Sequence, residues 1–276
     1  MSSVAVIILT YNEEENLPFA LRSVMGFADE VWVFDSFSTD RTEAIAREFG
    51  VNFKQHRFED FGKQRNAALA LPMASEWVLF LDADETISPE LGEEIARTIA
   101  TNPSENGFDI NRRFFWMGSW VKRGYYPTWI LRLFRRGKGV CEERSVNEHI
   151  IVDGTIGRLQ HHLDHEDRTG VQRWIKKHLG YAEREAEELL RADHRGTADA
   201  SLFGHQSNRK RWIKHNVWDK LPPLVRPGLY FSYRYIARGG FLDGKEALSY
   251  HILQALWFQT MVDLRYLEKK RGPSRD

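Results

Sequence analysis

Four short apolar runs alternate with helical segments in the first hundred residues, and this alternation limits the possible folds more than any other feature of the sequence. The runs are Val4–Leu9, Val31–Phe34, Val51–Phe53 and Trp77–Leu81. Val4–Leu9 is continuously apolar instead of alternating with polar residues, which is typical of a strand covered on both faces. Repeated strand–helix units of this kind predict an α/β fold, with a mostly parallel sheet flanked by helices.

Polar clusters follow the first, second and fourth of these predicted strands. They comprise Thr10, Tyr11, Asn12 and Glu13; the segment from Asp35 to Asp40, which includes Ser36 and Ser38; and Asp82, Ala83, Asp84 and Glu85. Because parallel strands bring their carboxyl ends to one edge of a sheet, we expect the three clusters to converge there. Ligands of open α/β sheets bind beyond that edge, so the clusters also predict the binding site.

Asp82 and Asp84 supply two carboxylates directly after a buried strand. Hard oxygen ligands with room left for water and phosphate suit Mg²⁺ or Mn²⁺. Such an ion would bridge two phosphates and neutralise charge as a nucleoside diphosphate departs. The alternative is an acidic turn in which the two Asp residues cap a helix. An isolated D-x-D pair is common, and its position after the strand is what favours the metal.

Two further groups are predicted to contact a nucleotide. Asp35 is placed to hydrogen-bond a base or a ribose, although Asp is also a frequent turn residue. Lys63 and Arg65 lie at the start of a predicted helix over 62–71, where Arg65 can pair with a phosphate. The alternative for this segment is a solvated basic turn.

Charge is unevenly distributed, although the net formal charge is zero. Residues 1–100 contain 18 acidic against 8 basic side chains, so the remaining residues carry a balance of +10. An acidic N-terminal part argues against a nucleic-acid partner, whereas an acidic and a basic part together suit phosphate-bearing ligands or an anionic membrane. The single cysteine, Cys141, excludes a disulfide framework and fits a reducing cytosol.

The chain is predicted to have two parts. Strand-like runs at Phe108–Trp116, Trp129–Phe134 and Gly154–Leu159 extend an α/β domain over residues 1–165. Residues 166–276 then form a mainly helical C-terminal extension, with a last helix over Lys245–Lys270. The N-terminus lacks the features of a signal peptide, and the longest apolar stretch near the C-terminus is too short and polar to span a bilayer. We therefore expect a cytoplasmic protein.

Four motifs resemble, in the same order, those of the inverting glycosyltransferases of family 2. They are Val-Ile-Ile-Leu-Thr-Tyr-Asn-Glu, Asp-Ser-Phe-Ser-Thr-Asp-Arg-Thr, Lys-Gln-Arg-Asn-Ala-Ala and Leu-Asp-Ala-Asp-Glu, within residues 4–100. The resemblance implies the GT-A fold, with a nucleotide-sugar half over 1–100 and an acceptor half over 101–165. Weaker similarities point to the subgroup that adds glucose to the lipopolysaccharide inner core through a β-1,4 linkage. These lie at 131–136, 146–149, 152–154, 163–165 and 240–244.

The family resemblance also implies a ligand set. It places a UDP-sugar donor among the strand-end clusters, with Tyr11, Glu13, Asp35 and Arg65 around the nucleotide. Asp82 and Asp84 would lie at the metal and the diphosphate. A later histidine often completes the metal shell in GT-A enzymes, and His165 matches that position. The alternative for His165 is a loop residue that orders the chain.

An inverting single displacement needs a general base that takes the proton of the acceptor hydroxyl. Glu148 occupies the place of the family's His-Glu pair, although the preceding residue is Asn147 where the subgroup has histidine. Glu142 and Glu143 are alternative bases.

Acceptor and partner contacts are predicted from aromatic and basic residues. The aromatic stretch from Trp116 to Trp129 suits stacking on sugar rings, with simple packing over the site as the alternative. The segment 205–235 mixes cations with aromatics, which favours peripheral contact with an anionic membrane, or else a solvated patch beside the core. The last helix is a candidate homodimer contact.

Two other functions were weighed against sugar transfer to a membrane-linked bacterial glycan. A nucleotidyltransferase would share the α/β nucleotide site, but that class commonly has a glycine-rich loop with a lysine after its first strand. Here the first strand ends in Thr-Tyr-Asn-Glu. A non-catalytic module that binds nucleotide sugars would be favoured by loss of Asp82 or Asp84, and both are present.

Overall fold

The computed structural model describes residues 3–142, 149–193, 218 and 220–271 of the 276-residue chain. Contacts within the chain define two compact units. Unit 1 consists of Met1–Trp120 and Tyr125–Gly170, and unit 2 consists of Val121–Gly124 and Val171–Asp276. The short segment Val121–Gly124 thus belongs to unit 2, although the chain enters and leaves it from unit 1.

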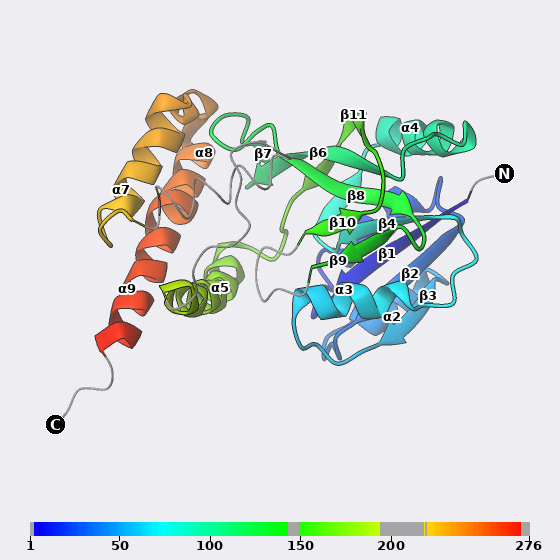
Figure 1. The fold of residues 1–276 in the computed structure, drawn as a ribbon, viewed down its shortest axis with the longest axis horizontal. Coiled ribbons are helices and arrows are strands. Elements are labelled where there is room, and N and C mark those ends of the chain that lie inside the picture. The colour runs from blue at the N-terminus through cyan, green and yellow to red at the C-terminus, as the bar shows by residue number, and fades with distance from the viewer. Residues whose placement is uncertain (1–2, 143–148, 194–217, 219, 272–276) are drawn as a thin grey trace. The chain divides into compact units, whose positions relative to one another are not determined.

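The strands of unit 1 build one mixed sheet and a separate hairpin (Figure 1). The described strands are β1 (Val4–Thr10), β2 (Glu30–Asp35), β3 (Asn52–Gln55), β4 (Trp77–Asp82), β5 (Glu85–Ile87), β6 (Gly107–Trp116), β7 (Ser119–Trp120), β8 (Trp129–Arg135), β9 (Gly139–Cys141), β10 (Ile150–Val152) and β11 (Ile156–His165). The main sheet has the order β3-β2-β1-β4-β8-β6-β11-β5, β7 pairs with β6, and β9 pairs with β10.

The predicted α/β class is confirmed, and the parallel pairing is concentrated in the N-terminal part of the sheet. β1 to β4 are parallel to one another, whereas β8 is antiparallel to both β4 and β6. β11 runs parallel to β6 and antiparallel to β5. The carboxyl ends of β1, β2 and β4 therefore share one edge of the sheet, as the strand–helix pattern predicted.

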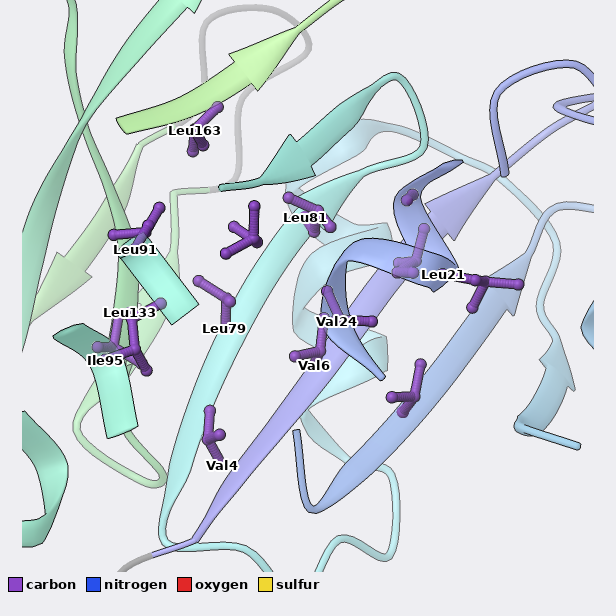
Figure 2. Packing of buried hydrophobic residues seen from close by; sticks show 14 of the residues in the cluster. Val4, Val6, Leu21, Val24, Leu79, Leu81, Leu91, Ile95, Leu133 and Leu163 are labelled. Atoms are coloured by element: carbon purple, nitrogen blue, oxygen red, sulfur yellow. The ribbon is translucent and has the colours of Figure 1, made fainter. Parts of the chain in front are cut away.

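Helices cover both faces of the sheet around β1, β2 and β4, which explains why these three strands are largely apolar. The helices of unit 1 are α1 (Leu17–Val24), α2 (Thr42–Glu48), α3 (Phe61–Leu69) and α4 (Pro89–Ala100). On one face Val4 and Val6 pack with residues of α1 and α4 (Figure 2). The alternate residues Ala5 and Ile7 face the other side, where they share a core with Ala68 of α3. Every position of β1 is thus beside apolar atoms.

Unit 2 is helical in its described part. It contains α5 (Val171–Asp193), α7 (Arg226–Phe231), a π-helix η2 (Ser232–Ala237), a 3₁₀ turn η3 (Gly240–Asp243), α8 (Gly244–His251), a π-helical stretch η4 (Ile252–Trp257) and α9 (Phe258–Arg271). Ala182 of α5 packs on Phe258 and Val262. The last three elements run without a break, so the helix predicted over Lys245–Lys270 is confirmed.

Two findings bear on the predicted membrane contact. Arg226, one of the cations in the segment 205–235, is buried, and its Nε donates to Asp263 Oδ1 at 2.6 Å. Most of the other cations of that segment lie outside the described residues. Among the described helices, none combines the length and the apolar character needed to cross a bilayer.

Candidate functional site

Asp35, the last residue of β2, is fully buried and organises the loops that follow β1 and β2. Its Oδ1 accepts a hydrogen bond from Thr10 Oγ1 at 2.9 Å, and its Oδ2 accepts from the Ser38 N–H at 2.8 Å. The Ser36 N–H donates to the carbonyl of Thr10 at 2.9 Å. Because a buried carboxylate needs such donors, Asp35 holds this loop in place. Its predicted contact with a base or ribose stays a prediction.

The loop after β1 is also bound directly to the loop after β2. Asn12 has φ 55, a left-handed conformation that asparagine adopts more readily than most residues. Its N–H donates to Ser38 Oγ and its Oδ1 accepts from the Thr39 N–H, both at 2.7 Å. The Glu13 N–H donates to Thr42 Oγ1 at 2.9 Å. The two predicted clusters therefore form one connected rim.

Helix α3 begins beside this rim. The N-cap residue Asp60 accepts from the Lys63 N–H at 2.7 Å, and Gln64 Nε2 donates to Ser36 Oγ at 3.0 Å. The ammonium of Lys63 is about half exposed and pairs with Glu59 at 2.8 Å. Lys63 is thus at the helix start as predicted, and its contact with a phosphate stays a prediction.

Two arginines grip the carboxylate of Asp82 at the end of β4. Arg65 Nη2 of α3 lies 2.9 Å from Oδ1, and Arg132 Nη2 of β8 lies 2.5 Å from Oδ2. Arg132 also contacts Glu85 Oε1 at 2.8 Å, and Arg112 of β6 lies 3.4 Å from the same atom. Arg65, Arg132 and Glu85 are all buried. This arginine clamp joins a helix to the strands β4, β5, β6 and β8.

The clamp keeps both carboxylates charged, although Glu85 is fully buried and the Asp82 side chain is only 32% exposed. Burial raises the pKa of Asp82, but Arg132 and Arg65 outweigh it and hold that pKa well below the usual range. Burial also raises the pKa of Glu85, but the charge of Arg132 outweighs this effect and lowers the pKa to about 2. The pKa of Arg132 is raised by the two carboxylates against the effect of its own burial. Removing one partner would leave uncompensated buried charge.

Asp84 and His165 meet beside the clamp. The antiparallel pairing of β11 with β5 sets His165 opposite Glu85, and the imidazole stacks on Phe114 with ring centroids 5.2 Å apart. His165 Nδ1 lies 3.5 Å from Asp84 Oδ1 and 3.9 Å from Glu85 Oε1. The Glu166 N–H donates to the carbonyl of Asp84 at 2.9 Å, which fixes the end of β11 to this turn.

Asp84 and His165, two of the three predicted metal ligands, lie close enough together to share one divalent ion. His165 Nδ1 is buried without a well-formed hydrogen bond to the residues that the structure describes, and Asp84 is 8% exposed. Two adjacent ligands on an octahedral ion with bonds of about 2.1 Å lie roughly 3 Å apart, close to the observed 3.5 Å separation. Asp82, by contrast, already accepts from two guanidinium groups.

No group of three or more His, Cys, Asp or Glu side chains within the described ranges is arranged to hold a metal by itself. Ala83, which separates the two aspartates, packs its side chain into the core. Nucleotide phosphate and water would therefore have to complete the coordination, which is how Mg²⁺ usually binds at phosphate-transfer sites.

The aromatic stretch is partly buried and partly at the surface. Trp116 is buried, whereas Trp120, Tyr125, Tyr126 and Trp129 are intermediate in exposure. Trp120 meets Tyr126 edge to face at 5.4 Å, and the Tyr126 hydroxyl lies 2.9 Å from His162 Nε2. Stacking of these rings on an acceptor sugar stays a prediction.

Glu148, the predicted base, lies outside the described residues, as does the alternative Glu143. The other alternative, Glu142, is described: its carboxylate lies 3.6 Å from His149 Nδ1, and its N–H donates to the His149 carbonyl at 2.9 Å.

Three residues of the site, Arg132, Glu85 and Phe37, have no individual role predicted from the sequence. A single arginine within the apolar run Trp-Ile-Leu-Arg-Leu-Phe signals a buried ion pair, because an unpaired buried cation is too costly. Glu85 follows the aspartate pair and is fully buried. Phe37 has φ 60 and, like Tyr11, leaves more than half of its side chain exposed on the rim.

The chain belongs to glycosyl transferase family 2, whose sequence model matches residues 5–165. A TPR repeat-containing protein of Synechococcus elongatus is 31% identical, over 99% of this chain and 72% of the relative. An uncharacterized glycosyltransferase of Rickettsia typhi is 26% identical, over 69% of each chain. Family membership supports a glycosyltransferase that uses a nucleotide-sugar donor.

Solved structures with a similar fold were also found. S. aureus TarS, residues 1–349, is 18% identical and aligns with 99% of this chain and 93% of its own, with a TM-score of 0.47. Glucosyl-3-phosphoglycerate synthase from Mycobacterium tuberculosis, in complex with Mn²⁺, UDP and phosphoglyceric acid, is 22% identical with a TM-score of 0.35. That alignment covers 42% of this chain, which spans less than half of the synthase (44%).

The arginine clamp predicts acid sensitivity that depends on Glu85. Its pKa is about 2 in the folded protein and 4.5 as the reference value, so its contribution to stability is present above pH 4.5 and is lost as pH falls toward 2. Between about pH 5 and about pH 3 we expect the free energy of unfolding to drop on the order of 2 kcal/mol more for the native sequence than for Glu85→Gln. Denaturant titrations at each pH measure this, with the exposed Glu93→Gln as the matched control. If the free energy of unfolding changed equally with pH in all three proteins, the lowered pKa of Glu85 would be contradicted.

Proposed function

We propose that this glycosyltransferase moves a sugar, specifically glucose, from a UDP-sugar to a hydroxyl of a membrane-linked bacterial glycan such as the lipopolysaccharide core, with inversion at the anomeric carbon. The observation that carries the proposal is the meeting of the clamped Asp82 with the Asp84–His165 pair beside the rim of Asp35. Glucose and the core acceptor rest on the subgroup motifs, which include 131–136 and 240–244. The single buried Cys141 supports a cytoplasmic enzyme working at the inner face of the membrane.

The rim is the proposed nucleotide site. Tyr11 and Phe37 are more than half exposed and would stack on a base, and the hydrogen bond from the Asn12 N–H to Ser38 Oγ joins the two loops that carry them. Arg65 would face the diphosphate. Its Nη2 donates to Asp82, and its Cζ lies 5.3 Å from the centroid of the Phe80 ring. An anchored guanidinium loses little freedom on binding a phosphate.

Asp84 and His165 are the proposed protein ligands of Mg²⁺ or Mn²⁺. A bound ion would offset the charge that develops on the departing UDP. The protein's own part is to hold these two side chains in place: Phe114 stacks on the imidazole, and the β5–β11 pairing fixes the backbone. Asp82 keeps Arg65 and Arg132 beside them.

The reaction also needs a base on the acceptor side. We propose that Glu148 takes the proton of the acceptor hydroxyl as its oxygen attacks the anomeric carbon and the bond to UDP breaks. Glu142 is the weaker candidate because its carboxylate already faces His149. Peripheral contact with the membrane would bring the enzyme to its acceptor, and a homodimer through the last helix is the other proposed partner contact.

The donor site is tested by calorimetric titration with UDP, GDP and dTDP, with and without Mn²⁺. We expect UDP to bind in a metal-dependent way and Asp84→Ala or His165→Ala to weaken that binding at least about tenfold, because each removes a ligand. Asp153→Ala, whose side chain is 81% exposed in the β10–β11 turn, is the matched control. Failure of every nucleotide to bind would remove the basis of the proposal.

The base is tested by comparing Glu148→Gln with Glu142→Gln and Glu143→Gln. Loss of a general base lowers turnover about 10²–10⁴-fold, so we expect that drop for Glu148→Gln only, with the affinity for UDP unchanged. UDP release from UDP-glucose in the presence of truncated lipopolysaccharide core is the measurement. A comparable drop in Glu142→Gln or Glu143→Gln, with Glu148→Gln near the native rate, would reassign the base.

A further inference from the structure

Unit 2 exposes a set of large apolar side chains where η2 turns into α8. Tyr233 and Ile236 of η2 and Phe241 and Leu242 of η3 are each about half exposed or more, with 61% for Ile236 and 59% for Leu242. The Gly239 N–H donates to the Ile236 carbonyl and the Leu242 N–H to the Gly239 carbonyl, each at 3.0 Å, so the set is local. We call these four residues the apolar tip. Figure 1 shows α7 and α8, which precede and follow it, in the same helical unit.

The turn that carries the tip is rigidly built from its inner side. Gly239 and Gly244 have φ 72 and 88, which favour glycine. Gly240 packs so tightly that an added Cβ would lie 2.5 Å from His251 Nε2. The side chain of Asp243 is buried and accepts from the Arg123 backbone N–H at 2.5 Å and from its Nη1 at 2.6 Å.

The inner positions are therefore fixed by glycine contacts and an ion pair, whereas the outward positions hold Phe241 and Leu242. A turn that served only to connect two helices would gain nothing by presenting these side chains to water, because exposing a large apolar group is less favourable than burying it. Contiguous exposed apolar side chains mark an interaction surface.

The charges around the tip are positive. Arg238 and Lys245 flank it and are exposed, the latter with 91% of its side chain. The acids between residues 220 and 256 of the described chain are Asp243, which is buried against Arg123, and Glu246, whose Oε1 lies 3.9 Å from the Lys245 Nζ. Exposed apolar side chains flanked by Arg238 and Lys245 match the interface of an anionic lipid bilayer.

We propose that the apolar tip inserts into the interfacial layer of an anionic membrane, with Arg238 and Lys245 at the headgroups. This inference rests on the proposed function, in which the acceptor glycan is linked to a membrane. A second copy of the chain fits the surface less well: a two-fold contact would place the tip against itself, and its exposed cations would then face one another.

Insertion is tested with an environment-sensitive fluorophore on Leu242→Cys of the full-length chain. The native Cys141 is buried, so labelling of the unsubstituted protein measures the background. Vesicles of phosphatidylcholine with phosphatidylglycerol should raise and blue-shift the emission, and vesicles of phosphatidylcholine alone should do so weakly. A label on Met25→Cys, an exposed apolar position of unit 1, should not respond.

Sedimentation with the same vesicles tests the energetic role of the tip. Phe241→Ser/Leu242→Ser should lower the partition coefficient at least about tenfold, whereas the matched double variant Met25→Ser/Val140→Ser, which also removes two exposed apolar groups, should not. Arg238→Glu/Lys245→Glu should weaken binding to the anionic vesicles selectively. Circular dichroism and metal-dependent UDP binding of each variant confirm folding.

Two results would overturn the inference. One is an unresponsive label together with unchanged partitioning of Phe241→Ser/Leu242→Ser. The other is self-association without vesicles that this variant abolishes, which would make a second copy the occupant. Because insertion is read without substrate, a protein that inserts but binds no nucleotide would refute the proposed donor site and still support the membrane surface.

Discussion

The site depends most on the sharing of the Asp82 carboxylate between Arg65 and Arg132, with Glu85 completing the group. These charges come from a helix and three strands, and all but Asp82 are almost wholly shielded from water. In a low-dielectric surrounding each charge needs its partners, so the group has one satisfactory arrangement. The carboxyl end of β4 and the start of α3 are thereby held at a fixed separation, and the rim formed by Asp35 is connected to them through Gln64 and Ser36.

The two aspartates have different partners: Asp82 is held by Arg65 and Arg132, whereas Asp84 lies beside His165. In the proposed function, Asp84 would help hold the metal ion and Arg65 would supply positive charge to the diphosphate. This difference in partners also explains why a motif of only three residues needs its structural context: the same two carboxylates in an open turn would have neither the arginines nor the histidine.

The strands and the edge where their ends meet could be predicted from the sequence, whereas the long-range contacts of the site could not. The apolar runs of β1, β2 and β4 predicted these strands and the edge where their ends meet, because burial on both faces leaves a local signature. The contacts of Arg132 were not predictable in the same way, since they join β8 to residues about fifty positions earlier in the chain. The strand expected to end at Leu159 continues to His165, because His161, His162 and Asp164 find partners in Glu94, Tyr126 and Arg113. A strand whose polar side chains bond to distant elements lacks the apolar pattern by which strands are predicted.

The proposed metal site is tested most directly by locating Mn²⁺ through anomalous diffraction from crystals grown with Mn²⁺ and UDP. We expect the anomalous peak within bonding distance of Asp84 and His165, with Asp82 still held by Arg65 and Arg132 and the diphosphate completing the coordination. A peak bonded to Asp82 with the arginines displaced, or one remote from His165, would contradict the proposed site.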